Sequence, residues 1–388
     1  MKVFYYCWHE NSARDMAEAL MCLGCDVYQN HIPFSDYEND EEFIRTVEKQ
    51  FVENACDIFL SFDFFPLLAK LAEKMQKRYI SWIYDCPHNT LYSPSIRSEY
   101  VSLFVFDKKQ YYLMQAIKGG HVHHMPLAVN AERLNSMLGT DWKNVNYVYD
   151  VSFVGSLYEN NLYQRVKYLP EYIRGYVQGI IEAQKRVYGY NLIQEVLDQN
   201  VLAEMKKYIK MSMPESYLID DSQLFIDMIN AEVTHQERME SLKIVTGYFD
   251  VKLFTASHSD ALPPNIFAGI VSYDREMPKI FRESKINLNF TLRSIESGIP
   301  LRVLDVLGAG GFLLTNYQPE IAEYFENGKE VVMFDSKEDM LDKIAYYLEH
   351  EEERKQIAYN GWLKVQKEFT YQKQLAEILD LAEKDNGK

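Results

Sequence analysis

The first 130 residues alternate nearly continuous apolar runs with segments of helical periodicity. The runs YISWIY (79–84) and VSLFVF (101–106) predict strands that are buried on both faces of a parallel sheet. Between such runs, for example over residues 67–75, apolar residues recur at the three- and four-residue spacing of an amphipathic helix. This alternation predicts a doubly wound α/β domain.

A second region of the same kind begins near Tyr149. Its predicted strands are 149–156, 251–254, 269–273, 286–290, 311–315 and 331–334. The chain has 388 residues, which is more than one hydrophobic core usually supports. We therefore predict two Rossmann-like domains, comprising residues 1–147 and 148–370.

Residues 160–235 interrupt the second alternation, because they are mostly helical in pattern and rich in tyrosine. We interpret them as a helical insert in the second domain. Tyr168, Tyr172 and Tyr176 are four residues apart and share one predicted helix face. That face is either an exposed surface on which a ring-shaped ligand stacks, or part of an ordinary helical core.

The chain is acidic, with 41 Lys and Arg residues against 57 Asp and Glu residues and a net charge of −16. Binding to nucleic acid or to an anionic membrane surface depends on neutralising phosphates, so this balance argues against both partners. A local basic site for one small phosphate ligand remains compatible with it.

No run of about 18 uncharged apolar residues occurs, so we predict no integral membrane segment. The first apolar run, MKVFYYCW, stops at His9 and Glu10, unlike a signal peptide. Five cysteines, all within the first 86 residues, do not form the framework of a disulfide-rich secreted domain. Together these features predict a cytoplasmic location.

Polar residues follow the predicted strands of the first domain, where parallel sheets bind ligands. Asp85 and His88 follow the run 79–84, and an acid and a histidine held there could form a general-base pair. The alternative is that Asp85 caps the next helix and His88 packs internally. Asp63 and Asp107 also follow strands, but the sequence after each favours a helix cap.

The segment His121-Val-His-His124 suggests a metal site. No carboxylate or cysteine lies at ligand spacing nearby, so we favour structural histidines and predict no bound metal.

The strand ends of the second domain carry Gly155-Ser156, Thr255, Tyr273-Asp274, Thr291 and Asn316. A polar loop begins at Arg293 and leads to Pro300, a predicted first helical residue. Arg302 and Asp305 follow on one face of that helix. A helix N-terminus and an arginine suit phosphate oxygens, and an acid suits ribose hydroxyls. The alternative is an Arg–Asp ion pair on a solvated face.

Several segments resemble the CgeB-like family of bacterial glycosyltransferases. The C-terminal ones are INLNFT, IPLRVLDVLGAGGFLLTN, FENGKEVVMF and YYLEHEEERKQIAYNGWLKVQKEFTY. FVGSLYENN, WIYDCPH, FVFD and MPLAVN are also similar to this family. The resemblance covers most of the chain except the helical insert.

This resemblance implies a GT-B fold, in which two Rossmann-like domains face a cleft and a C-terminal helix, here 371–388, crosses back to the first domain. It implies metal-independent transfer of a sugar from a nucleotide-sugar co-substrate, with no other cofactor, to an acceptor held mainly by the first domain. Asp85 and His88 are then the catalytic candidates. The donor-binding candidates are Gly155, Ser156, Asn289, Arg293, Arg302 and Asp305, where the family usually has Glu at position 305.

Two other functions remain open at this stage. One is a nucleotide-sugar epimerase or a similar GT-B relative. The other is a non-catalytic nucleotide- or sugar-binding protein or a spore-surface maturation protein. A transferase releases nucleoside diphosphate slowly by donor hydrolysis, an epimerase interconverts sugars without releasing it, and a binding protein does neither. For a transferase, the tyrosine face of the insert is expected to stack on sugar rings and to help select the acceptor, which is a glycan, a protein or a small molecule.

Overall fold

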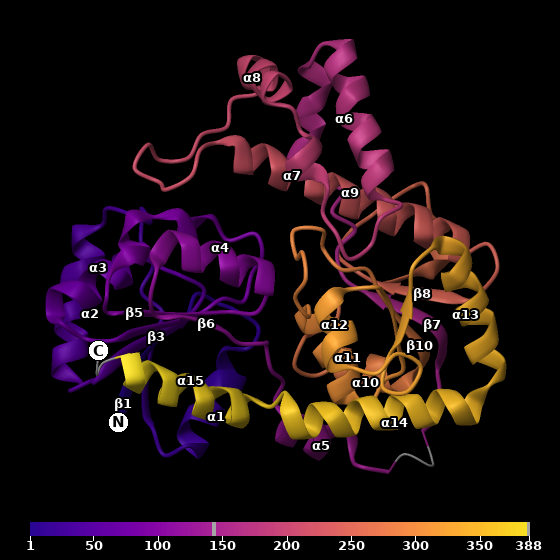
Figure 1. Ribbon diagram of the computed structural model, residues 1–388. Helices are drawn as coiled ribbons and strands as arrows, with labels where there is room; N and C mark the ends of the chain where they lie inside the picture. Colours follow the sequence, from indigo (N-terminus) through magenta and orange to yellow (C-terminus); the bar gives the residue numbers. More distant parts are fainter. Residues whose placement is uncertain (142–144, 386–388) are drawn as a thin grey trace. The chain divides into compact units, whose positions relative to one another are not determined.

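The computed structural model describes residues 1–141 and 145–385. The chain forms two compact units, and each contains one parallel α/β sheet, as predicted (Figure 1). The first unit comprises Met1–Asn130, Pro214–Ile219 and Glu368–Lys388, and the second comprises Ala131–Met213 and Asp220–Lys367. The units therefore divide after residue 130, whereas the sequence placed the domain boundary after residue 147.

The sheet of the first unit has the strand order β2-β1-β3-β4-β5-β6. Its strands are β1 (Lys2–Tyr6), β2 (Asp26–Asn30), β3 (Ile58–Phe62), β4 (Tyr79–Trp82), β5 (Val101–Val105) and β6 (Val122–His124). Every residue of β4 and β5 is buried, as their apolar runs predicted. Because β1 pairs with both β2 and β3, the order reverses between β1 and β3. Doubly wound sheets bind ligands at such a switch point, outside the carboxyl ends of the strands.

The helices of the first unit are α1 (Ala13–Cys22), α2 (Glu41–Glu53), α3 (Pro66–Met75), α4 (Lys108–Lys118) and α15 (Tyr371–Asp385), with 3-10 turns η1 (Asn89–Tyr92) and η2 (Pro94–Arg97). The predicted cap of α4 is confirmed, because the Asp107 carboxylate accepts hydrogen bonds from two first-turn amides. α15 packs against α1, and the Ser102 hydroxyl donates to Asp385 near its end, at 2.7 Å.

The sheet of the second unit has the order β12-β11-β10-β7-β8-β9. Its strands are β7 (Tyr149–Val154), β8 (Val251–Phe254), β9 (Phe267–Gly269), β10 (Ser284–Asn289), β11 (Leu313–Asn316) and β12 (Val332–Phe334). The predicted strand 269–273 is wrong, because β9 ends at Gly269 and Ile270 is 76% exposed. Gly269 has a φ of +89°, which turns the chain out of the extended conformation. The switch point of this sheet lies between β7 and β10.

Helices pack around this second sheet and form the insert. They are α5 (Ala131–Leu138), α6 (Glu171–Gln184), α7 (Ile193–Val196), α8 (Gln199–Tyr208), α9 (Ser222–Val245), α10 (Met277–Glu283), α11 (Leu301–Ala309), α12 (Pro319–Tyr324), α13 (Lys337–Glu349) and α14 (Glu351–Glu368), with 3-10 turns η3 (Leu162–Tyr168) and η4 (Pro264–Ile266). No helix in the described part of the chain is long and apolar enough to cross a membrane.

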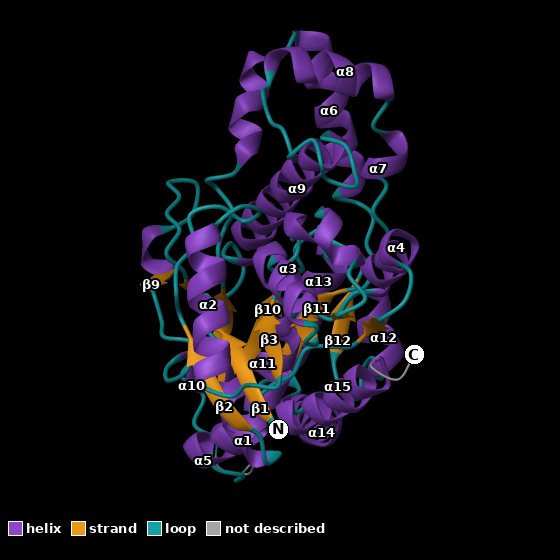
Figure 2. Ribbon diagram, turned by 90° about the vertical axis from the view of Figure 1, so that its left-hand side faces the viewer, coloured by secondary structure: helices purple, strands orange, loops and turns teal. Residues whose placement is uncertain are grey.

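The insert has its own apolar core, formed by η3, α6, α7, α8 and the first part of α9 (Figures 1 and 2). α9 is one continuous helix of 24 residues. Phe225 near its start belongs to the insert core, whereas Leu242 and Val245 near its end belong to the core around the sheet. The predicted end of the insert at residue 235 therefore lies inside this helix, which joins the two cores of the second unit.

Gly311, just after α11, allows the chain to lie close to α10. A Cβ atom at Gly311 would lie 2.5 Å from the backbone oxygen of Phe281 and 2.7 Å from the Asn287 amide nitrogen. The Phe281 oxygen cannot move aside easily, because it accepts a hydrogen bond from that Asn287 amide.

Gly311→Ala is therefore expected to lower the free energy of unfolding by roughly 1–3 kcal/mol, the usual cost of overpacking. Urea denaturation followed by circular dichroism measures this change. Gly179→Ala is the matched control, because a Cβ atom there meets nothing within 4 Å and the residue lies in the middle of α6. Alanine is the better helix former, so this control is expected to stabilise the protein slightly. Equal stability of Gly311→Ala and the parent would contradict the packing argument.

Candidate functional site

Arg238 of α9 spans the switch point of the second sheet. Its Nη1 donates to the carbonyl of Ser156, which follows β7, and its Nη2 donates to the carbonyl of Phe290, which follows β10. Both distances are 2.6 Å. The remaining guanidinium nitrogen, Nε, is buried and has no hydrogen-bond partner among the described residues. A positive charge thus lies at the carboxyl ends of two central strands.

This charge is held in an environment that disfavours it. Burial lowers the pKa of Arg238 to about 10, and the positive charge of Arg302 adds to the effect. Tyr158 and Glu237 act in the opposite direction. The guanidinium also lies over the rings of Tyr158 and Phe153, with centroid distances of 4.9 and 5.5 Å. Arg238 remains protonated at neutral pH, and an anion placed beside it would be stabilised electrostatically.

Arg302 and Asp305 lie on one face of α11, as predicted. Arg302 Nη1 is 3.1 Å from Asp305 Oδ2 and 2.6 Å from Met277 Sδ, and the guanidinium lies over the Phe281 ring. The Tyr273 hydroxyl donates to the other Asp305 oxygen at 2.9 Å. The two side chains are only 25% and 10% exposed, so the pair does not lie on a solvated face.

The sequence placed Pro300 at the first helical position, but Pro300 is the N-cap residue and α11 begins at Leu301. Arg302 is therefore in the first turn of α11, at the positive end of the helix dipole. Arg238 and Arg302 influence each other electrostatically, so two arginines and this helix end lie at one edge of the sheet, where Asp305 partly offsets the charge of Arg302.

The other predicted donor residues occupy different positions. Gly155 and Ser156 form the turn after β7, and Ser156 supplies a carbonyl to Arg238. Asn289 is buried in β10, where its amide donates to the hydroxyls of Thr315 at 2.9 Å and Thr291 at 3.3 Å. Asn289 therefore joins β10 to β11 beneath the strand ends.

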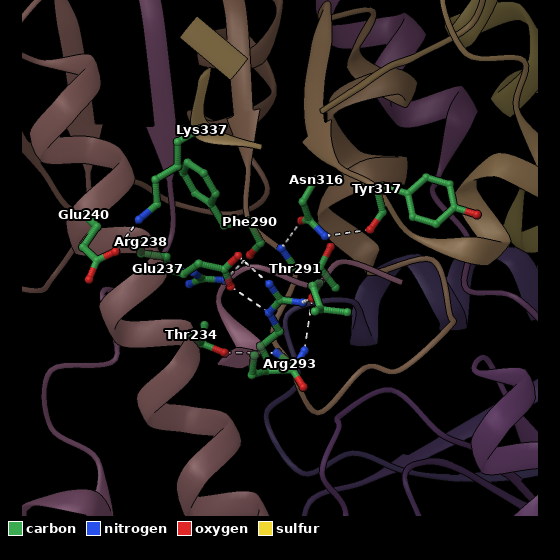
Figure 3. A network of polar contacts seen from close by, with 12 residues as sticks. Thr234, Glu237, Arg238, Glu240, Phe290, Thr291, Arg293, Asn316, Tyr317 and Lys337 are labelled. Atoms are coloured by element: carbon green, nitrogen blue, oxygen red, sulfur yellow. Dashed lines mark hydrogen bonds and ion pairs between the residues drawn. The ribbon is translucent and has the colours of Figure 1, made fainter. Parts of the chain in front are cut away.

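Arg293 has its guanidinium committed to the protein (Figure 3). It forms a two-pronged ion pair with Glu237 of α9, through Nε at 2.7 Å and Nη2 at 2.6 Å, while Nη1 donates to the Val187 carbonyl at 2.8 Å. The Thr234 hydroxyl accepts from its backbone amide. Arg293 thus fastens the loop after β10 to α9, and a phosphate could recruit it only by breaking this pair.

An open polar pocket lies at the carboxyl ends of β10 and β11. Its lining combines the loop after β10 with the segment between α6 and α7, and comprises Gln184, Gly189, Tyr190, Asn191, Thr291, Leu292, Arg293, Ile295, Glu296, Asn316 and Gln318. Amide, hydroxyl and carboxylate groups predominate, and such groups suit the hydroxyls of a small polar ligand.

In the first unit, Asp63 has a different role from the helix cap that the sequence favoured. Phe65 is the N-cap residue of α3, and Asp63 lies outside the helix with a φ of +57°. Its Oδ1 accepts hydrogen bonds from the backbone amides of Tyr84 at 2.9 Å and Asp85 at 3.0 Å. The cap prediction is wrong because these two amides, which follow β4, lie within reach of the carboxylate. Asp63 therefore positions the backbone that carries Asp85.

The carboxyl group of Asp85 is accessible and its acidity is shifted. Asp85 is exposed, yet neighbouring atoms displace part of the water around its carboxyl group and raise its pKa to about 6. The negative charge of Asp63 adds to this rise, and His88 opposes it. A carboxylate with a pKa near 6 is a stronger base than an ordinary aspartate and is still mostly ionised at neutral pH.

His88 is held by internal contacts. The backbone amide of Phe64 donates to Nε2 at 3.1 Å, and the Thr90 hydroxyl lies 2.6 Å from the same nitrogen. Nδ1 is 3.9 Å from Asp63 Oδ1, which is beyond hydrogen-bond distance. His88 thus packs beside the carboxylate that positions Asp85, and its own Nε2 is occupied.

The histidines of 121–124 form separate contacts. His123 Nε2 lies 3.0 Å from Asp385 Oδ2, and His121 Nδ1 lies 3.0 Å from the carbonyl of Glu99. Within residues 1–141 and 145–385, no group of three or more His, Cys, Asp or Glu side chains is arranged to hold a metal ion.

The sequence analysis missed Arg238, although a signal for it exists. Arg238, Leu242 and Val245 follow one another at helical spacing, so an arginine stands in line with two core residues. A buried arginine in an apolar stripe requires a compensating partner, and it therefore marks a candidate site.

The C-terminal part of the chain resembles a known family. Residues 237–380 match a family model described as "Glycosyl transferase-like". An uncharacterized protein of Aquifex aeolicus (strain VF5) is 25% identical over 149 residues, which covers 38% of this chain and 36% of the relative. The chain thus matches about a third of that relative's length.

Solved structures resemble the whole chain at low sequence identity. A glycosyltransferase from Rickettsia africae ESF-5 is 12% identical, with a TM-score of 0.52 and coverage of 99% of this chain and 98% of that one. The T4 phage β-glucosyltransferase is 10% identical, with a TM-score of 0.52 and 99% coverage of both chains. At these identities the comparisons establish the fold. The chain is a protein of the GT-B fold whose residues 237–380 match the glycosyl transferase-like family model.

Proposed function

We propose that this protein is a glycosyltransferase that uses a nucleoside-diphosphate sugar as donor. The observation that carries the proposal is the position of Arg238, which bridges the ends of β7 and β10 beside Arg302 and the N-terminus of α11. The match of residues 237–380 to a glycosyl transferase-like model covers both arginines. The T4 phage β-glucosyltransferase has been solved with its UDP-glucose substrate, which supports the choice of donor class.

Each part of the donor has a chemically suitable neighbour in the second unit. The diphosphate is expected beside Arg238, Arg302 and the first turn of α11, where positive charge is concentrated. Asp305, already held by Tyr273, is expected to accept hydrogen bonds from the ribose. The polar pocket beside Thr291 and Asn316 suits the hydroxyls of the transferred sugar.

The proposed reaction moves a glycosyl group between two oxygens. The hydroxyl oxygen of the acceptor forms a bond to the anomeric carbon of the sugar, and the bond from that carbon to the diphosphate oxygen breaks. Asp85 accepts the proton of the hydroxyl, and the nucleoside diphosphate leaves with the negative charge. Two arginines and a helix N-terminus stabilise that charge, which is the task that a divalent cation performs in other transferases.

We infer from this charge balance that transfer needs no bound metal. Turnover in excess EDTA is expected to equal turnover in buffer alone. Loss of activity in EDTA that is restored by Mg²⁺ or Mn²⁺ would contradict this part of the proposal.

Calorimetry with UDP and slow hydrolysis of UDP-glucose to UDP test the donor proposal directly. Binding with UDP release is expected for a transferase. Interconversion of sugars without UDP release would indicate an epimerase, and binding without either reaction would indicate a binding protein.

Asp305→Asn separates the ribose contact from the diphosphate contact. It is expected to weaken UDP binding by roughly 2- to 10-fold, the range for a hydrogen bond of about 0.5–1.5 kcal/mol. Binding of inorganic diphosphate is not expected to weaken, since it has no ribose and the substitution removes a negative charge beside Arg302. If Asp305→Asn weakens the binding of UDP and of inorganic diphosphate equally, Asp305 does not contact the ribose.

A further inference from the structure

The tyrosines that the sequence placed on one face of the insert are not part of its core. Tyr168 and Tyr172 are 63% and 67% exposed, and Tyr176 is 39% exposed. The insert core is instead built from aliphatic side chains and Phe225. The reading of these tyrosines as an ordinary helical core is therefore wrong. Large exposed aromatic side chains that gather on one surface mark an interaction site.

Tyr208 at the end of α8 joins this surface. It is 48% exposed, and its hydroxyl and that of Tyr172 both lie near enough to Lys207 to interact with it electrostatically. Arg165 of η3 donates to the carbonyl of Lys210 just after α8, at 3.3 Å. These contacts bring η3, α6 and α8 together, and Figures 1 and 2 both show α6 beside α8. We call Tyr168, Tyr172 and Tyr208 the tyrosine surface.

Basic side chains accompany the tyrosine surface. Arg165, Lys167, Lys207 and Lys210 are all exposed, and the Lys167 ammonium group lies 5.1 Å from the centre of the Tyr168 ring. Glu204 pairs with Lys207, so one of these charges is partly neutralised.

The part of the insert that carries the tyrosine surface has the same sign of charge. Residues 160–213 contain eight Lys and Arg residues and five Asp and Glu residues, a net charge of +3 in a chain of −16. The rest of the insert, residues 214–235, contains five Asp and Glu residues and no Lys or Arg, so the positive charge is confined to residues 160–213. A negatively charged partner would be attracted to this region and repelled by much of the remaining surface.

We propose that the tyrosine surface binds an acidic glycan chain. This glycan is either the acceptor of the transfer reaction or the part of the acceptor chain beyond the reacting sugar. Exposed tyrosine rings offer flat apolar faces for the C–H groups of sugar rings, and their hydroxyls donate and accept hydrogen bonds. The neighbouring lysines and arginine pair with the carboxylates or phosphates of the glycan. Only the identification of this glycan as an acceptor rests on the proposed function, whereas its binding is a property of the insert.

Binding is tested on the full chain without nucleotide, by calorimetry at low and high salt. The probes are oligogalacturonate, which carries carboxylates, poly(glycerol phosphate), which carries phosphates, and neutral dextran of similar length. At least one acidic probe is expected to bind more tightly than dextran. Its affinity is expected to fall as salt is raised, because salt screens exposed charges. The acidic probe that binds identifies the anionic group.

Tyr172→Ala and Tyr208→Ala are each expected to weaken binding of the acidic glycan by roughly 2- to 10-fold, in line with the energies of aromatic contacts. Tyr248→Ala is the matched control, because Tyr248 is 75% exposed and lies outside the insert, after α9. UDP binding, measured on the same variants, is expected to remain at the parent value, which shows that folding and the donor site are intact.

Several results would overturn the proposal. These are no binding of either acidic probe, equal binding of dextran, or equal loss in Tyr248→Ala. Tighter binding of single-stranded oligo(dT), which also stacks on aromatic rings, would assign the surface to nucleic acid instead. Glycan binding together with a failure to bind UDP would leave the tyrosine surface supported and would refute the proposed donor.

Discussion

Arg302→Ala is expected to weaken UDP binding by about 10- to 150-fold, the equivalent of losing a charged hydrogen bond of roughly 1.5–3 kcal/mol. Arg302 lies in the first turn of α11, and its guanidinium is a quarter exposed and so accessible to a ligand. Turnover is expected to fall as well, because negative charge grows on the departing diphosphate. Calorimetry with UDP and with inorganic diphosphate measures the loss, and both ligands are expected to be affected.

Arg275→Ala is the matched control for Arg302. Arg275 is 83% exposed, lies just before α10 in the same unit, and pairs with Asp274 at 3.5 Å. Its loss changes the net charge equally and is expected to leave UDP binding close to the parent value. Arg302→Lys keeps the charge but loses the planar fork, so it is expected to bind UDP with intermediate affinity. If Arg302→Ala binds UDP like the parent, the donor assignment is wrong.

Asp85→Asn is expected to lower kcat by roughly 10²- to 10⁴-fold, the usual contribution of a general base. UDP binding is expected to be unchanged, because Asp85 belongs to the first unit and the donor residues to the second. In the parent, activity is expected to rise with pH through about 6, since the group acts as a base only when deprotonated and its pKa is about 6. The Asn variant is expected to lack this rise.

Asp63→Asn distinguishes positioning from catalysis. An asparagine oxygen can still accept from the amides of Tyr84 and Asp85, so the backbone is expected to remain in place. The variant removes a negative charge that raises the pKa of Asp85, so the rise in activity is expected to move to lower pH. Glu73→Gln, at an exposed carboxylate on α3 of the same unit, controls for a general change of surface charge. An unshifted pH profile in Asp63→Asn would show that Asp63 does not influence the base.

The sequence determined the class of each domain and much of the position of its elements. β5, predicted from a run of apolar residues, is buried at every residue because a parallel sheet is covered on both faces. The Asp107 cap was predictable because a cap depends on residues that are adjacent in the chain. The pairing of Arg302 with Asp305 was predictable for the same reason, since three residues bring two side chains onto one face of a helix.

Contacts between distant parts of the chain were decided only by the tertiary structure. Asp63 is followed by a proline-started helix, as a cap would be, yet its carboxylate binds amides 21 and 22 residues further along. Arg293 was a donor-binding candidate, and in the structure Glu237, 56 residues away, is bound to it in the interior. Arg238 gained its position because β7 and β10 are neighbours in the sheet but far apart in sequence.

The tyrosines of the insert illustrate the same limit. Spacing placed Tyr168, Tyr172 and Tyr176 on one helix face, but Tyr168 ends η3 and only Tyr172 and Tyr176 lie on α6. Periodicity alone also cannot say whether such a face is turned toward a core or toward solvent. The aliphatic residues of η3, α6, α7, α8 and α9 fill the core, which leaves the tyrosines outside. Local patterns fix which residues share a face, because they depend on the geometry of one helix or strand. What each face contacts depends on packing between elements, and that is decided by the whole fold.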